Sequence, residues 1–283
     1  MGIEYYNESF DESVKYIKPN SVDLFFLDPP YYISGNKKNI DLTDGDRSDW
    51  DSQWKTKGEF YQWIKKSLEL AYLQLKPTGS LYLCISWQHS HHFHSLLEEV
   101  GFNVQNRITW KRDKGRGSKT NWKSMHEDVF FATKHKDNYT FNVDDVMVEK
   151  NVVAPYRNSD GTPKGWWINE DGKKVRLTYP GNIWIDLCVP YWSMLEVKSY
   201  AKTKKTPINK FKKHNTQKPK ELVKRCILAS SHVNDLVVDY FSGSGTTAVV
   251  CAEQNRKCIT FDVNKTYIEI LKTRLKNEVS KNP

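Results

Sequence analysis

The feature that most constrains the fold is a strand, a glycine loop, a helix and a second strand that follow one another late in the chain. Residues 235–240 predict a buried strand, and the loop Phe241-Ser242-Gly243-Ser244-Gly245 opens a helix over residues 246–255. A second strand over residues 257–262 ends at Asp262, 19 residues after Gly243. Such a loop lets a ligand approach the backbone, and such an acid accepts hydrogen bonds from ribose hydroxyls. We predict an adenosine-containing cofactor here, although the spacing also fits a nicotinamide-dependent oxidoreductase.

Strands and helices also alternate in the first half of the chain. Hydrophobic spacing predicts helices that begin near Phe60 and Phe93 and strands over 22–27, 80–85, 102–110 and 129–133, the last two as an antiparallel pair. After Pro219 we expect a helix with Leu222 and Ile227 on its buried face, and a closing helix from Tyr267. This alternation predicts an α/β fold with a doubly wound, mostly parallel, Rossmann-like sheet.

The region between the two halves has a different character. Periodicity fades over residues 134–213, where proline, glycine, tryptophan and lysine accumulate. We predict residues 1–133 as one half of the core, 134–213 as an inserted loop-rich lobe, and 214–283 as the cofactor-binding half. Trp166, Trp167 and Trp192 are expected to pack in the small core of the lobe.

Charge favours a polyanionic partner without deciding it. The chain carries 43 basic and 34 acidic residues, a net charge of +9, and residues 198–224 contain ten lysines and one acid. A solvated basic surface explains the same numbers equally well. The basic residues that we expect to contact double-stranded DNA are Lys111, Arg112, Arg116, Lys119, Lys212 and Lys213.

The segment Asp28-Pro29-Pro30-Tyr31 follows the buried strand over residues 22–27. Prolines cannot extend the strand ladder, so the chain turns where open α/β sheets bind ligands, and we expect this corner to lie beside the glycine loop at neighbouring strand ends. The Asp28 carboxylate and the Pro29 carbonyl would be adjacent acceptors, which suits an exocyclic amino group with two hydrogens. Tyr31 would offer a ring face to a planar base. Taken alone, the segment is equally compatible with a simple turn.

The combination of motifs resembles a known family. DPPY (28–31), NTQKP (215–219) and DYFSGSGT (239–246), in that order, resemble the β group of DNA amino-methyltransferases that use S-adenosyl-L-methionine. The resemblance covers residues 18–133 and 214–276, and the intervening lobe corresponds to the family's variable DNA-recognition region. The departures are local, with Tyr240 in place of a more usual proline and His214-Asn215 in place of His-Pro.

The resemblance implies a role for each motif. The catalytic residues would be Asp28, Pro29, Pro30 and Tyr31, with Asp28 holding the target amino group and Tyr31 stacking on the flipped base. The cofactor would be bound by Asp239, Phe241, Ser242, Gly243, Gly245, Thr246, Asp262, Thr216 and Lys218. Aspartate at position 28 favours adenine N6 over cytosine N4, which stays the alternative.

The predicted function is site-specific methylation of DNA in a restriction–modification system, with a separately acting endonuclease as a possible partner. A non-enzymatic DNA-binding protein would leave the cofactor loop and Asp262 unexplained, and a protein or RNA methyltransferase fits the basic lobe less well. We expect a cytoplasmic monomer or homodimer of bacterial or phage type, without a membrane segment or secretory signal. His89, His91, His92 and His94 share no helical face with a carboxylate, so we predict no metal site and a solvated helix start.

Overall fold

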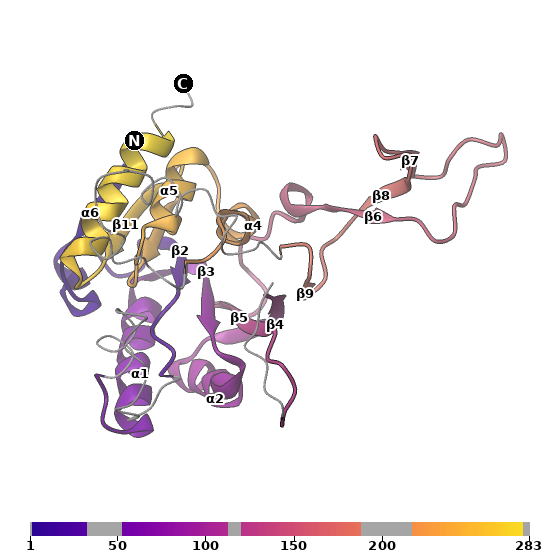
Figure 1. The fold of residues 1–283 in the computed structure, drawn as a ribbon. Coiled ribbons are helices and arrows are strands. Elements are labelled where there is room, and N and C mark those ends of the chain that lie inside the picture. The colour runs from indigo at the N-terminus through magenta and orange to yellow at the C-terminus, as the bar shows by residue number, and fades with distance from the viewer. Residues whose placement is uncertain (1, 33–52, 113–119, 188–216, 280–283) are drawn as a thin grey trace, which may run out of the picture.

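The computed structural model describes residues 2–32, 53–112, 120–187 and 217–279. Within them, eight strands form one sheet in the order β1-β11-β10-β2-β3-β5-β4-β9 (Figure 1). The first five are parallel, and β5 runs antiparallel to both β3 and β4. The strands are β1 Ile3–Tyr6, β2 Val22–Leu27, β3 Leu75–Ile85, β4 Asn103–Lys111, β5 His126–Thr133, β9 Ile183–Trp184, β10 Leu236–Asp239 and β11 Lys257–Phe261. The predicted doubly wound α/β fold is confirmed.

Helices cover both faces of this sheet. The α1 helix (Lys57–Gln74) and the α2 helix (Ser90–Val100) pack on one face. The opposite face is covered by α4 (Lys220–Ser230), α5 (Thr246–Glu253) and α6 (Lys265–Arg274). Figure 1 shows these two helical layers on either side of the strands. Short helical turns complete the described elements: η1 Phe10–Lys15, η3 Trp87–His89, η4 Val143–Val146 and η7 Leu275–Val279.

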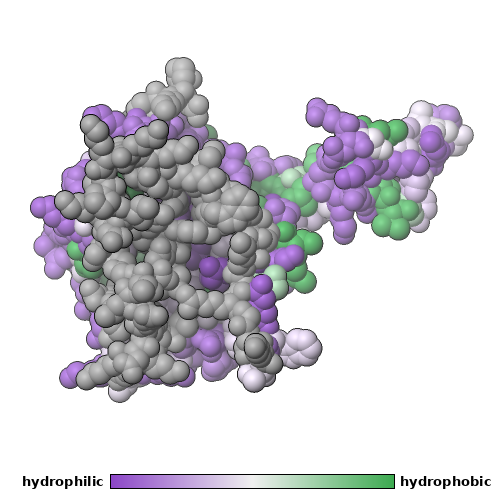
Figure 2. Space-filling model, viewed as in Figure 1, coloured by the Kyte–Doolittle hydropathy of each residue, from purple (hydrophilic) through white to green (hydrophobic). Residues whose placement is uncertain are grey.

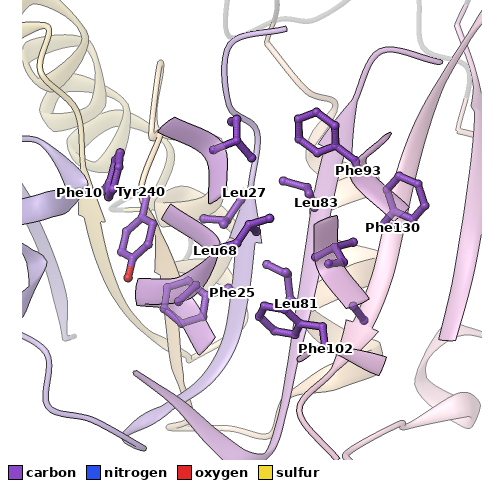
Figure 3. Packing of buried hydrophobic residues seen from close by; sticks show 14 of the residues in the cluster. Phe10, Phe25, Leu27, Leu68, Leu81, Leu83, Phe93, Phe102, Phe130 and Tyr240 are labelled. Carbon is purple, nitrogen blue, oxygen red and sulfur yellow. The ribbon is translucent and has the colours of Figure 1, made fainter. Parts of the chain in front are cut away.

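The continuous apolar run of β2 reflects burial on both faces. Phe25 and Leu27 point toward α1 and α2, whereas Leu24 and Phe26 pack beneath α4 and α5. Figure 3 shows the first of these clusters, with Phe25 and Leu27 beside Leu68 of α1. Each such fully buried side chain contributes about 1.5–3 kcal/mol of hydrophobic stabilisation. The two clusters fix the position of the strand end at Asp28.

Local signals place the helix ends. The Thr56 hydroxyl accepts a hydrogen bond from the Glu59 amide at 3.1 Å and caps α1. Gly101 ends α2 with a φ of 111°, the left-handed conformation that glycine favours after a helix. The β3 strand begins at Leu75 rather than Ser80, with a register irregularity opposite Val22 and Leu24 of β2. The hydrophobic pattern missed this early start because residues 76–79 have the composition of a turn.

A small separate sheet lies within the predicted lobe. Antiparallel strands β6 (Val148–Asn151), β8 (Lys174–Thr178) and β7 (Trp167–Ile168) extend away from the main body (Figure 1). Hydrophilic and hydrophobic residues mix over its surface in Figure 2. The β9 strand, also between residues 134 and 213, instead pairs with β4 in the main sheet.

The tryptophan prediction for the lobe is correct at one position and wrong at another. Trp166 is buried, and its indole N–H donates to the Tyr156 carbonyl at 2.6 Å. Trp167 is 41% exposed, because neighbouring side chains of an extended segment point to opposite sides and Trp166 takes the buried one. Trp192 lies outside the described residues.

Candidate active site

Two strand ends meet at the centre of the sheet. The β2 and β10 strands are parallel neighbours, with Leu24 opposite Val237 and Phe25 opposite Val238. From this pair the chain continues in opposite directions across the sheet, to β3 after β2 and to β11 after β10. This is the topological switch point at which open α/β sheets bind ligands. Asp28 and Gly243 line one cavity of about 280 Å³, so the predicted proximity of the two motifs is confirmed.

The glycine loop is held by its flanking acids. The Asp239 carboxylate accepts hydrogen bonds from the Phe241 amide at 2.9 Å and the Thr247 hydroxyl at 2.6 Å. The Asp262 carboxylate accepts from the Gly243 amide and the Asn264 amide, both at 2.8 Å. Both acids line the cavity, and each retains lone pairs beyond these bonds.

Burial changes the ionisation of these two acids. Burial raises the pKa of Asp239 to about 7, against the lowering effect of the bonds from Thr247 and Phe241. Burial likewise raises the pKa of Asp262 to about 6, although two backbone amides favour its anion. Carboxylates with such pKa values gain from a ligand that supplies further donors.

Gly245 has a conformational role in the loop. Its φ is 81°, and a Cβ at this position would lie 2.5 Å from Cγ of Leu271 on α6. Only glycine fits both the left-handed backbone and the close helix. Arg274 of α6 supports the same loop from inside the protein, donating to the Ser244 carbonyl at 3.0 Å and the Thr246 hydroxyl at 3.1 Å.

An aromatic wall closes one side of the cavity. The rings of Phe10, Trp63 and Phe241 lie with centroids between 5.3 and 5.9 Å apart. Phe241 was predicted as a cofactor residue, whereas Phe10 and Trp63, together with Glu8 and Ser9, were not. The wall suits a planar heterocycle.

Two buried polar groups in the cavity lack a protein partner among the described residues. They are the Ser242 hydroxyl and the Gln217 amide nitrogen. Buried polar groups are normally paired, so both are available to a ligand. The Gln217 position follows directly after Thr216, which lies outside the described residues together with Arg116, Lys119, Lys212 and Lys213.

The corner at Asp28 contains a compact charge cluster. Lys218 donates hydrogen bonds to both Asp28 carboxylate oxygens, at 2.7 and 2.8 Å. The Tyr31 hydroxyl lies 2.9 Å from Oδ1 of Asp28 and 3.1 Å from Oε2 of Glu127. Arg112 donates to Oε1 of Glu127 at 2.6 Å. All five residues line the cavity.

The predicted DNA contacts and histidines have specific positions. Lys111 ends β4, and Arg112 contacts Glu127 inside the cavity. His89 is buried and lies 3.0 Å from the Tyr61 hydroxyl, so the predicted solvated helix start is wrong there. The histidine is covered because α1 packs beside α2 and brings Tyr61 onto it. The described residues contain no group of three potential metal ligands and no helix long and apolar enough to cross a membrane.

Comparison with known proteins identifies the family. Residues 22–273 match a family model named N6_N4_Mtase and described as DNA methylase. The chain belongs to this family of DNA methylases. This DNA methylase is 31% identical to the type II methyltransferase M.HpaI of Haemophilus parainfluenzae, over 94% of this chain and 72% of the relative. It is 33% identical to the DNA adenine methyltransferase YhdJ of Escherichia coli strain K12, over 93% of this chain and 79% of the relative.

A solved structure shares the fold of this DNA methylase. The crystal structure of the M1.HpyAVI–SAM complex matches with a TM-score of 0.60 at 21% identity, covering 96% of this chain and 98% of that chain. The family model and the two relatives confirm the family resemblance predicted from the three motifs. The roles of individual site residues stay predictions.

Proposed function

We propose that this DNA methylase transfers a methyl group from S-adenosylmethionine to N6 of adenine in double-stranded DNA. The observation that carries the proposal is the single cavity that joins the Asp28 corner to the glycine loop. A methyl donor and an amino acceptor must meet within one enclosed space, because transfer requires the reacting atoms to be close and aligned.

The cofactor half of the cavity fits S-adenosylmethionine. Asp262, at the end of β11, would accept hydrogen bonds from the ribose hydroxyls with lone pairs that Gly243 and Asn264 do not use. The aromatic wall around Phe241 would contact the adenine ring, and Ser242 and Gln217 would bind the polar amino-acid end. S-adenosylmethionine supplies a methyl group on a sulfonium centre, which is electrophilic without any covalent enzyme intermediate.

The other half of the cavity fits an amino group. Asp28 and the Pro29 carbonyl would each accept one of its hydrogens, drawing the nitrogen toward a tetrahedral geometry and freeing its lone pair for attack. Tyr31 would stack on the base, which must leave the duplex at a cost of about a few kcal/mol. Pro30 would keep the turn rigid, because its ring fixes the backbone.

The choice of adenine is supported by Asp28 and by the name of the E. coli relative. The family model covers N4 as well as N6 methylases, so cytosine N4 is the alternative substrate. The type II relative M.HpaI supports a place in a restriction–modification system. A separately acting endonuclease, a monomeric or homodimeric state and a cytoplasmic location stay predictions from the sequence.

Methylation of genomic DNA in vitro tests the proposal. The purified protein is incubated with DNA and S-adenosylmethionine labelled in its methyl group, and modified-base sequencing identifies the base, atom and site. We expect N6-methyladenine within one short sequence. Asp28→Ala should lose the modification but still bind the cofactor in a calorimetric titration. Label on cytosine N4 would select the alternative, and no label in DNA would contradict the proposal.

A further inference from the structure

The charge cluster at the cavity has a composition that calls for an explanation. Two carboxylates, Asp28 and Glu127, and two cations, Lys218 and Arg112, lie together and balance in charge. The Lys218 side chain is only 6% exposed, and its ammonium lies 3.4 Å from Oε2 of Glu127 as well as on Asp28. The family resemblance predicted that Lys218 binds the cofactor. Its ammonium is instead hydrogen-bonded to Asp28, in the half of the cavity proposed for the target amino group.

The hydrogen bonds from Lys218 leave an acceptor site on Asp28 for a substrate. A carboxylate offers about four acceptor sites. Oδ1 of Asp28 accepts a hydrogen bond from Lys218, and a second one from Tyr31 when the hydroxyl hydrogen of Tyr31 points toward it. Oδ2 accepts a hydrogen bond from Lys218 alone. One site on Oδ2 therefore stays available for an amino hydrogen. Among the described residues, no hydrogen bond uses the Pro29 carbonyl, which is available for the second.

We propose that Lys218 is a positioning residue that keeps the Asp28 carboxylate anionic and oriented toward the target amino group. The inference rests on the proposed methyl transfer. An amino group needs acceptors, and only the anion of Asp28 offers an acceptor site in every orientation. A neutral carboxyl would carry a hydrogen on one oxygen, so it would offer fewer and weaker acceptor sites and would oppose an N–H donor wherever that hydrogen points at the amino group.

The surroundings of Asp28 explain why a cation is needed. Burial raises the pKa of Asp28, Lys218 lowers it, and Glu127 on β5 raises it again. Asp239 on β10 is a further acid that interacts with it, and Cys84 on β3 is a buried thiol whose own pKa is raised by burial, so it stays neutral. Tyr31 remains a hydroxyl, because burial raises its pKa well above the usual value. Arg112 faces Glu127, so Lys218 is the cation in direct contact with Asp28.

The proposal predicts opposite effects from two substitutions. In Lys218→Met, Asp28 loses its counter-ion and should protonate at higher pH. In Glu127→Gln, a neighbouring negative charge is lost and Asp28 should protonate at lower pH. A merely structural role would not produce shifts of opposite sign. Lys218→Arg keeps the charge and serves as the conservative variant.

The experiment measures the single-turnover rate of DNA methylation against pH at saturating cofactor and DNA. In Lys218→Met we expect the apparent pKa of the acidic limb of the pH–rate profile to rise by about 1–3 units. Below that pKa the rate should fall about tenfold for each pH unit. Glu127→Gln should lower the limb, and Lys218→Arg should restore it to within about half a unit of wild type. The matched control is Lys220→Met, which removes a lysine paired with Glu253 and Glu278 outside the cavity and should leave the limb unchanged.

Cofactor affinity, measured by calorimetry, separates this role from the one that the sequence implied. We expect all four variants to bind S-adenosylmethionine with a dissociation constant within about threefold of wild type. That change is smaller than the effect of losing one hydrogen bond to a charged group. An unmoved limb in Lys218→Met, or a loss of affinity that matches its loss of rate, would overturn the proposal. If Lys218→Met does not fold, Glu127→Gln still tests the proposal. An acidic-limb pKa in Glu127→Gln that is unchanged or higher than in wild type would overturn it. Failure of the proposed function would appear separately, as absence of methyl transfer by the wild-type protein.

Discussion

Asp262 accepts a hydrogen bond from the backbone amide of Gly243 at 2.8 Å and so joins the end of β11 to the loop after β10. A second bond, from Asn264, leaves two of the approximately four acceptor sites of the carboxylate unused. One carboxylate thus shapes the loop and remains able to bind the hydroxyls of a ribose.

Asp262→Asn should weaken binding of S-adenosylmethionine. Replacing a charged acceptor of hydroxyl hydrogen bonds costs about 1.5–3 kcal/mol, or roughly 10- to 100-fold in the dissociation constant. Isothermal calorimetry measures this directly. Glu269→Gln removes a carboxylate that lies outside the cavity, on α6, and serves as the matched control. Equal affinities in the two variants would show that Asp262 does not bind the cofactor.

Cofactor affinity should fall as the pH falls through neutrality. Burial raises the pKa of Asp239 to about 7 and that of Asp262 to about 6 from an ordinary value of 3.8, so both carboxylates take up protons in this range. Protonation removes acceptor sites, so affinity is full above these values and is lost as pH falls below them. Because binding favours the anions, it should release protons at a pH of about 6.5. Binding enthalpies in buffers of different ionisation enthalpy measure that release, and it should decrease in Asp262→Asn.

The sequence predicted the framework of the site because each of its two motifs is a short, continuous stretch of residues. An apolar run that ends at Asp28 and a glycine loop that precedes a helix are patterns within about ten residues, and each sets its own backbone. The general rule for strand ends in α/β sheets then placed both motifs together. The structure confirms that placement through the register of Leu24 against Val237.

The remaining walls of the site could not be predicted in the same way. Trp63 of α1 and Phe10 of η1 enter the cavity from elements far apart in the chain, and no local pattern distinguishes them from core or surface residues. Tyr240 shows the same limit. It replaces a more usual proline, and its hydroxyl donates to Gln74 of α1 at 2.6 Å inside the core, which only the packed fold reveals.

Gly245→Ala should destabilise the protein more than another glycine substitution with a similar backbone. At Gly245 the new Cβ meets Leu271 in addition to adopting a φ of 81°, and the two effects together cost about 2–5 kcal/mol. Gly172 has a φ of 75°, and a Cβ added there would have no atom within 4 Å, so Gly172→Ala should cost only about 1–2 kcal/mol of strain. Denaturant unfolding measures both. A similar loss in the two variants would show that contact with α6 does not restrict the loop.

The small sheet in the lobe should contribute to DNA binding through a pair of like charges. Lys150 of β6 lies directly opposite Arg176 of β8, and both side chains are exposed. Like charges in opposed positions destabilise a sheet, so a pair without a described acidic partner is best explained by a polyanion that binds across it. Lys150→Gln with Arg176→Gln should therefore weaken DNA binding and reduce the slope of log affinity against log salt by about 2.

Two further measurements decide whether these charges act on DNA alone. The free energy of unfolding should stay the same or rise in the double variant, because the substitutions remove repulsion between the strands. As a control with the same loss of charge, Lys257→Gln with Lys265→Gln changes two exposed residues on the main body of the protein. It should leave the salt slope nearly as in wild type. Equal slopes in the two double variants would show that binding follows net charge rather than this surface. A lower stability of the lobe variant would instead assign the pair a structural role.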